Sequence, residues 1–205
     1  GFRGFDLKDK KIGIIGGGHI GMHVARMANG FEMKTLVFDI KKNKRLSKKF
    51  KFKYVKLDYL LKNSDVITLH VPLNKYTKHM INTKNLKKIK KGALLINTAR
   101  GELIETIAIM KGLANKTFKA AGLDVLEGEG RIREEKELLH DKFIKERDLR
   151  THLQNHILLN QENVVITPHN AFNSREALQR ILDTTVDNIK AFKRKKNINV
   201  VNNKV

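Results

Sequence analysis

The chain has 205 residues and carries 42 Lys and Arg against 21 Asp and Glu, so its formal net charge at pH 7 is +21. Cysteine is absent, which excludes disulfides and a thiolate nucleophile and fits a reducing compartment such as the cytoplasm. No apolar run approaches the ~20 residues that cross a bilayer, and no leader with a cleavage site is visible, so we expect no membrane partner.

The positive charge would attract nucleic acid or an acidic surface. The basic clusters recur along the whole chain, at 41–45, 84–91 and 193–196, and they lack the interleaved aromatic residues of a single-strand groove. A solvated, lysine-rich surface explains this distribution better than a nucleic-acid partner does. A basic nucleic-acid-binding module remains an alternative that the charge permits and no motif supports.

Strand-like and helix-like segments alternate along the chain. Short apolar runs typical of strands occur at 12–15, 35–40, around 54, 66–71, 93–97, 120–125 and 164–167. Helix-like segments lie between them at 19–29, 57–63, 86–91 and 105–115. This alternation predicts an α/β fold, a doubly wound parallel sheet of about six or seven strands with helices on both faces.

Two segments depart from the alternation. Residues 131–160 are charged and helix-prone, and we expect a helical excursion from the sheet there. Residues 175–196 carry apolar residues at helical spacing, which predicts a long amphipathic helix. The expected division is a dinucleotide-binding domain over 1–172, with the excursion inside it, and a C-terminal segment over 173–205.

A glycine loop, KIGIIGGGHIG at 11–21, follows the first strand. Gly16, Gly18 and Gly21 fit the pattern G-x-G-x-x-G. The first glycine allows a tight turn, the second lets the backbone approach a pyrophosphate, and the third lets helix and strand pack closely. The phosphates would then face unpaired N–H groups at a helix N-terminus. The pattern predicts a dinucleotide site of the Rossmann type.

Asp39 ends the next strand, where an acid can accept hydrogen bonds from the ribose hydroxyls of the adenosine. Its charge repels a 2′-phosphate, so the sequence favours NAD over NADP as the cofactor. The basic side chains at 41–45 lie close by and weaken this inference, because they could partly neutralise a phosphate.

Five blocks of the sequence together resemble the D-isomer-specific 2-hydroxyacid dehydrogenase family. They are GGGHIG at 16–21, LLKNSDVITLHVPLNKYTKHMIN at 60–82, GALLINTARGELIE at 92–105, AGLDVLEGEG at 121–130 and VVITPHNAF at 164–172. The His19-Ile20 pair and the EGE and TPHNAF forms are similar to the D-lactate dehydrogenase branch. The resemblance implies hydride transfer between NADH and a small 2-oxoacid to give a D-2-hydroxyacid.

The resemblance also implies the catalytic residues Arg100, Glu129 and His169. A guanidinium suits the carboxylate and polarised carbonyl of an oxoacid because it is a fixed, permanently charged fork. His169, after the last strand, is the candidate proton donor. Glu129 would orient the imidazole and favour its charged form, with Glu127 as the rival for that role. Hydride transfer of this kind needs no metal, and no cluster of ligands has metal-site spacing.

Further contacts with the cofactor are implied at the ends of the strands. They are His19, Ile20, Val71, Pro72, Thr77, Thr98, Ala99, Arg100 and Asp124, in addition to the glycines and Asp39.

In this family a substrate domain normally precedes the cofactor domain, yet only about ten residues precede the first strand here. We therefore expect the chain to be a fragment that lacks this N-terminal domain, with 173–205 as the segment that returns to it. Family members usually dimerise through the cofactor domain, so a homodimer is expected for the full-length protein. The remaining alternative is a non-enzymatic, NAD-responsive interaction protein like the corepressor branch of the family.

Overall fold

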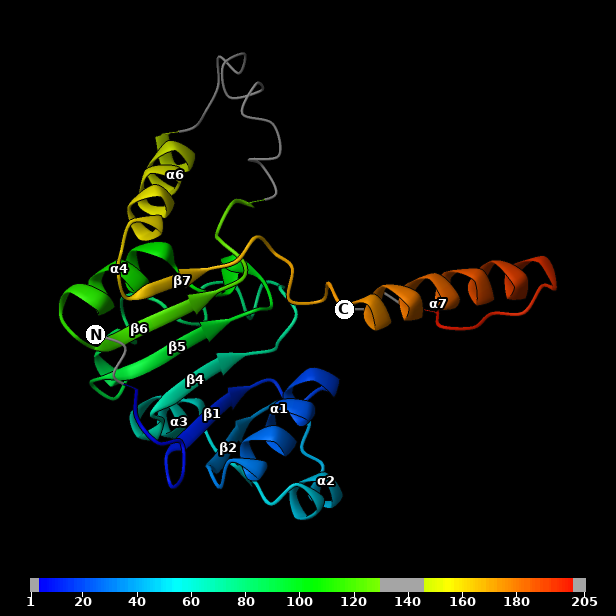
Figure 1. Cartoon of the computed structure of the whole chain (residues 1–205), viewed down its shortest axis with the longest axis horizontal. Helices are drawn as coiled ribbons and strands as arrows, with labels where there is room; N and C mark the ends of the chain where they lie inside the picture. The colour runs from blue at the N-terminus through cyan, green and yellow to red at the C-terminus, as the bar shows by residue number, and fades with distance from the viewer. Residues whose placement is uncertain (1–3, 130–145, 201–205) are drawn as a thin grey trace. The chain divides into compact units, whose positions relative to one another are not determined.

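The computed structural model describes residues 4–129 and 146–200, in two compact units (Figure 1). The first unit ends at Pro168 and the second begins at His169. The domain division expected after residue 172 concerns the whole protein and stays a prediction. Within the expected excursion, residues 131–145 lie outside the described residues, and the remainder contains helix α6 (Glu146–Leu159).

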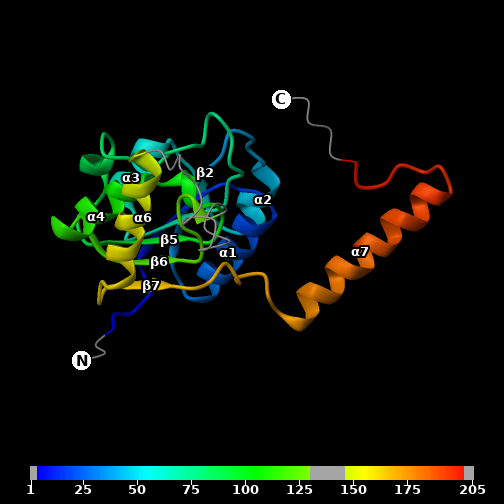
Figure 2. The same ribbon diagram turned by 90° about the horizontal axis from the view of Figure 1, so that it is seen from above.

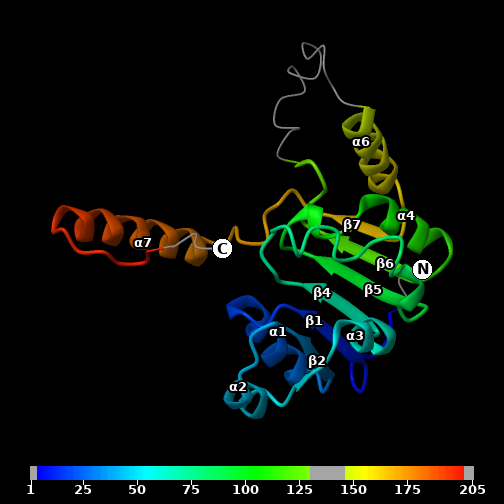
Figure 3. The same cartoon turned by 180° about the vertical axis from the view of Figure 1, so that it is seen from behind.

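A parallel sheet of seven strands forms the centre of the first unit, in the order β3-β2-β1-β4-β5-β6-β7 (Figure 3). Its strands are β1 (Lys11–Ile15), β2 (Lys34–Phe38), β3 (Lys53–Tyr54), β4 (Val66–Leu69), β5 (Ala93–Asn97), β6 (Phe118–Leu123) and β7 (Val164–Ile166). The strand order reverses between β1 and β4, which creates a crevice at the carboxyl edge where ligands of doubly wound sheets bind. The predicted fold class is confirmed.

Helices follow most of the strands. They are α1 (His19–Gly30), α2 (Lys44–Lys49), α3 (Leu57–Asn63), α4 (Thr106–Ala114) and α6, with 3₁₀ turns at Leu86–Lys88 and Gly101–Leu103. Figure 2 shows α3, α4 and α6 towards the same side of the first unit, and all three contribute side chains to one core. Because successive strand residues point to opposite faces, the apolar runs of the sheet contribute side chains to two separate cores, one on each face.

Adjacent residues of one strand point to different cores. Ile14 of β1 belongs to the same core as Met22 and Ala25 of α1, whereas Ile15 belongs to the core that contains Leu60 of α3 and Ile109 of α4. Central strands buried on both faces read as continuous apolar runs, as β1 and β4 do. Burial on both faces fixes the register of the sheet and, with it, the position of every loop at the carboxyl edge.

Three elements differ from the sequence-based expectation. Helix α2 occupies a lysine-rich stretch without apolar periodicity, and the Asn43 side chain caps it by accepting a hydrogen bond from Leu46 N at 3.1 Å. Strand β6 begins at Phe118, two residues earlier than predicted, because the Phe118 side chain is fully buried. The basic segment 86–91 forms only one 3₁₀ turn.

The second unit contains α7 (Arg175–Lys193), which confirms the predicted long helix. Ser174 Oγ caps it by accepting a hydrogen bond from Ala177 N at 3.1 Å. Its predicted apolar face is exposed; the side chains of Leu178, Ile181, Leu182, Val186, Ile189 and Phe192 are between 41% and 81% accessible. Over the part of the chain that the structure describes, none of the helices has both the length and the apolarity to cross a membrane.

Candidate active site

The glycine loop between β1 and α1 has no room for side chains at two of its three positions. Gly16 has φ 104°, and a Cβ there would lie 2.6 Å from the carbonyl oxygen of His70. A Cβ on Gly21 would lie 1.9 Å from the carbonyl oxygen of Gly16. By contrast, a Cβ on Gly18 would meet nothing within 4 Å, so its backbone is open to a ligand. These are the three tasks that the sequence pattern assigned to the glycines.

Asp39 lies directly beside this loop, one residue beyond β2. Its carboxylate accepts hydrogen bonds from Gly17 N at 2.6 Å and from Lys41 N at 2.7 Å. Two backbone donors therefore hold the carboxylate against the glycine turn. The basic side chains that follow, Lys41 to Arg45, are exposed. The loop and Asp39 together form the cradle that a dinucleotide requires.

The loop after β4 forms the other wall of the crevice. The backbone of His70 and the side chain of Val71 lie against Gly16, the latter 2.9 Å from its virtual Cβ position. Pro72 is exposed, and its carbonyl accepts a hydrogen bond from Thr77 Oγ1 at 2.6 Å, which closes the loop. Val71, Pro72 and Thr77, three expected cofactor contacts, thus belong to one short structure at the switch point between β1 and β4.

His70 is largely buried beneath this crevice. Its Nε2 lies 2.9 Å from the hydroxyl of Thr68. Burial disfavours the charged imidazolium and lowers the pKa of His70 to about 4. His70 is therefore neutral at physiological pH and adds no positive charge to the nucleotide crevice.

Arg100 is placed by a turn that the buried side chain of Asn97 holds. Asn97 Nδ2 donates to the carbonyl oxygen of Arg100 at 2.8 Å, and its Oδ1 accepts from Ala99 N at 3.1 Å. Thr98 and Arg100 are exposed, and the guanidinium donates to the carbonyl of Ala99 at 2.6 Å. This task of Asn97, which lies within the block at 92–105, was not predicted from the sequence. The available signal was the asparagine itself, because an Asn side chain often forms hydrogen bonds with the backbone two or three residues further along a turn.

Glu129 and its neighbour Glu127 have different surroundings. Glu129 Oε2 accepts from Leu126 N at 2.9 Å within a tight turn. Glu127 Oε1 lies 2.6 Å from His79 Nε2, and its Oε2 accepts from both N and Oγ1 of Thr106. Both oxygens of Glu127 are thus engaged within the protein, and the choice between Glu129 and Glu127 as the partner of the catalytic histidine stays a prediction.

Asp124 is buried at the end of β6 and accepts a hydrogen bond from the hydroxyl of Thr167 at the end of β7. This contact anchors the chain where it leaves the sheet at the carboxyl edge. His169, which follows Pro168, opens the second unit, is exposed and has φ 50°.

Within the first unit, the candidate residues follow the carboxyl ends of five strands. Gly16, Asp39, Val71, Arg100 and Glu129 come after β1, β2, β4, β5 and β6, respectively. Because all strands are parallel, these ends share one edge of the sheet. His19 and Ile20 begin α1 and are exposed at that same edge. Residues 4–129 and 146–200 contain no group of three His, Cys, Asp or Glu side chains suited to a metal ion.

Comparison with known families accounts for this arrangement. The family model described as "D-isomer specific 2-hydroxyacid dehydrogenase, NAD binding domain" matches residues 1–171. Among curated relatives, a D-specific alpha-keto acid dehydrogenase of Enterococcus faecalis is 38% identical over 196 residues, which cover 94% of this chain and 55% of the relative. A glycerate dehydrogenase of Methylorubrum extorquens is also 38% identical, over 96% of this chain and 54% of the relative.

Solved structures of dehydrogenases superpose closely on the chain. The D-lactate dehydrogenase of Aquifex aeolicus, complexed with NAD and lactic acid, matches with a TM-score of 0.82 and 38% identity over 93% of this chain and 55% of that one. The D-lactate dehydrogenase of Lactobacillus jensenii with NAD+ matches with a TM-score of 0.81 and 31% identity, over 98% and 57%.

The chain spans about half the length of the curated relatives that it matches. The half that it spans contains the glycine loop, Asp39 and the strand ends described above, and the residues at that cradle fit a dinucleotide. The chain therefore belongs to the D-isomer specific 2-hydroxyacid dehydrogenase family and carries its NAD-binding domain.

Proposed function

We propose that this chain is the cofactor-binding half of an NAD-dependent dehydrogenase that reduces a small 2-oxoacid to a D-2-hydroxyacid. The observation that carries the proposal is the shared carboxyl edge, where the glycine cradle with Asp39 lies along the same sheet edge as Arg100 and Glu129. The relatives that support it are named as a D-specific alpha-keto acid dehydrogenase, a D-lactate dehydrogenase and a glycerate dehydrogenase.

The cofactor would be held by the first half of the sheet. The pyrophosphate fits the open backbone at Gly18 and the N-terminus of α1, and the adenosine ribose fits the carboxylate of Asp39. The side chains of Val71, Thr98 and Asp124 would line the path to the reacting end. Bound NADH supplies the hydride that reduces the substrate carbonyl.

Arg100 would bind the oxoacid. Its exposed guanidinium can donate two parallel hydrogen bonds to a carboxylate or to a carboxylate and the adjacent carbonyl oxygen. The buried Asn97 beneath it holds the turn at both ends, so the backbone that carries the guanidinium has a fixed place. A permanently charged donor also stabilises the negative charge that develops on the carbonyl oxygen.

His169 would give its proton to that oxygen, and Glu129 would orient the imidazole. A histidine can donate a proton near neutral pH and take it back in hydroxyacid oxidation.

The test uses the full-length protein, since the chain alone covers half of its relatives. We expect loss of NADH absorbance with pyruvate or a homologous 2-oxoacid, and chiral chromatography should identify the D product. His169→Ala should remove most of the turnover while the Kd for NADH changes little, because the proton is transferred only in the transition state. A protein that binds NADH tightly but reduces none of the oxoacids would instead be an NAD-responsive binding protein.

The finer assignments are a homodimer and a cytoplasmic location. The absence of cysteine fits a reducing compartment. Light scattering of the full-length protein at several concentrations tests the dimer, and a concentration-independent monomer mass would reject it.

A further inference from the structure

We propose that the hydrogen-bonded pair His79–Glu127 is a positioning pair, which fixes the segment that carries Arg100 against the segment that carries Glu129. This inference rests on the proposed function, in which Arg100 and Glu129 work at the substrate. Neither member of the pair is expected to touch substrate or cofactor, so both would act through the groups that they place.

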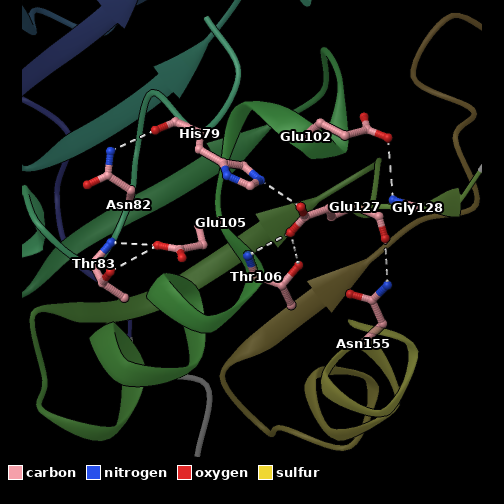
Figure 4. Close-up of polar contacts among 9 residues, drawn as sticks. All are labelled: His79, Asn82, Thr83, Glu102, Glu105, Thr106, Glu127, Gly128 and Asn155. Carbon is pink, nitrogen blue, oxygen red and sulfur yellow. Dashed lines mark hydrogen bonds and ion pairs between the residues drawn. The ribbon is translucent and has the colours of Figure 1, made fainter. Parts of the chain in front are cut away.

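Glu127 connects its own turn to three other parts of the first unit (Figure 4). Its Oε1 lies 2.6 Å from His79 Nε2, in the loop after β4. Its Oε2 accepts from Thr106 N at 3.1 Å and from Thr106 Oγ1 at 2.9 Å, at the start of α4. Its carbonyl accepts from Asn155 Nδ2 of α6 at 3.0 Å. Both carboxylate oxygens and the backbone carbonyl of Glu127, two residues before Glu129, thus accept or share hydrogen bonds.

His79 connects the same loop to the turn that follows Arg100. Its backbone N–H donates to the carbonyl of Glu102 at 2.8 Å, and its own carbonyl accepts from Asn82 Nδ2 at 2.8 Å. Its φ of 51° lies in the left-handed region, which non-glycine residues rarely adopt. This backbone conformation directs the imidazole toward Glu127 (Figure 4).

Direct packing completes the connection between the two segments. Glu102 Oε1 accepts from Gly128 N at 3.4 Å, and a Cβ on Gly101 would lie 2.1 Å from the carbonyl carbon of Leu126. The side chains of His79 and Glu127 are only 21% and 16% exposed, so water competes weakly for their hydrogen bond. The Arg100 turn and the Glu129 turn are therefore joined twice, once by their own contact and once through His79 and Glu127.

The positioning role predicts how variants behave. Asn tolerates the left-handed conformation of residue 79, but its side chain is too short to reach Glu127, so His79→Asn removes the pair without new backbone strain. Glu127→Gln keeps an oxygen for Thr106 and gains an amide that can donate to a neutral His79. It should therefore preserve the connection, whereas Glu127→Ala should break it.

Glu105 offers the matched control. Its Oε2 accepts from Thr83 N at 2.8 Å and from Thr83 Oγ1 at 3.1 Å, so it also joins the loop after β4 to the start of α4 (Figure 4). None of these bonds reaches the Glu129 turn. Glu105→Ala should lower the unfolding midpoint to a similar degree as His79→Asn while leaving the two turns in place.

The first measurement needs no catalysis. Amide hydrogen exchange of the folded 205-residue chain should be at least about tenfold faster at 100–103 and 126–129 in His79→Asn and Glu127→Ala. Exchange at these segments should be unchanged in Glu127→Gln and in Glu105→Ala. Unchanged exchange in His79→Asn, in a variant whose circular dichroism is that of the parent chain, would overturn the inference whatever the activity.

The second measurement uses the full-length protein and oxoacid reduction. Because a misplacement of about 1 Å can cost up to ~10²-fold, we expect kcat to fall about tenfold or more in His79→Asn while the Kd for NADH is unaltered. Glu127→Gln should keep kcat within about threefold of the parent. If Glu127→Gln instead abolishes turnover, Glu127 acts as a carboxylate in the reaction and the positioning role is wrong. An inactive parent protein would refute the proposed function alone, and the exchange data would still decide whether the pair holds the two turns.

Discussion

At the scale of single residues, backbone N–H groups and buried amides place the charged side chains of the site. Asp39 is held by Gly17 N and Lys41 N, and the Arg100 turn is held by Asn97. Such bonds fix a side chain before the ligand arrives, which reduces the cost of ordering on binding. The expected effects of substituting Asp39 and Arg100 differ and can be measured separately.

For Asp39 we expect a change in cofactor preference. Asp39→Ala removes an acceptor for the ribose hydroxyls and a charge that repels a 2′-phosphate, so the Kd for NADH should rise roughly ten- to hundredfold while that for NADPH changes less. Asp39→Asn keeps an oxygen for Gly17 N and isolates the effect of charge. Calorimetry with both cofactors is the measurement. Tighter NADPH binding by the unaltered chain would shift the specificity to Lys41 to Arg45.

For Arg100 we expect that a positive charge alone does not suffice to bind the oxoacid. Arg100→Lys keeps the positive charge but replaces a planar fork by a single ammonium, so kcat/KM for the oxoacid should fall roughly ten- to hundredfold. NADH binding should be affected far less. Steady-state kinetics of the full-length protein decide this point; a lysine variant with parental kcat/KM would mean that Arg100 does not bind the carboxylate through two bonds.

At the scale of elements, the sequence predicted the strands and helices whose formation depends on a pattern of apolar residues. The runs at β1, β4 and β5 were confirmed because burial on both sheet faces demands apolar side chains there. The glycine turn before α1 was confirmed because Gly16 and Gly21 leave no room for a Cβ. Helix α2 was missed, since it depends on the Asn43 cap and not on periodicity. The contact between His79 and Glu127, 48 residues apart, was not predicted because it exists only after the fold has formed. The roles of Arg100, Glu129 and His169 stay predictions.

Helix α7 has an exposed apolar face, from which we expect self-association of the 205-residue chain. Leu182→Glu places a charge on this face and should shift the chain towards monomer. Thr184→Glu adds the same charge away from the apolar face and serves as the control. Light scattering over a range of concentrations gives the masses. Equal masses for both variants would show that α7 does not drive the association.

At the scale of the whole molecule, His70 should make stability depend on pH. Its pKa is about 4 in the folded chain and near 6.5 in the unfolded chain, because burial disfavours the imidazolium. The unfolded state therefore binds more protons than the folded state between these two pH values. The free energy of unfolding should have its highest value above pH 6.5 and should fall by up to about 3 kcal/mol as the pH is lowered towards 4.

The matched variant for this prediction is His70→Asn, which carries no titratable group. Urea unfolding of both proteins from pH 4 to pH 7.5 gives the difference in unfolding free energy at each pH. The parent chain should lose stability relative to the variant as the pH falls. A constant difference across this range would mean that His70 is not desolvated in the folded state.

We also expect the chain alone to bind NAD(H) but to turn over poorly. Its relatives are about twice as long, and a reaction of this kind needs a closed, water-poor cleft. Turnover of the 205-residue chain should be lower than that of the full-length protein by a factor of about 100 or more. Comparable rates from both proteins would contradict this expectation.

The contact between Gly21 and Gly16 has a further consequence for the kinetics of cofactor capture. The nearest neighbour of Gly21 is the backbone carbonyl of Gly16, and neither glycine has a side chain whose rotamer must be selected when a phosphate arrives. Because the contact that fixes the turn involves no side-chain rotamer at Gly16 or Gly21, we expect encounter with a dinucleotide not to wait for a rearrangement of the loop. The speed of association at this end of the site should then be limited by diffusion and orientation of the ligand, and any slow step of binding should arise at the other end, where the substrate is held.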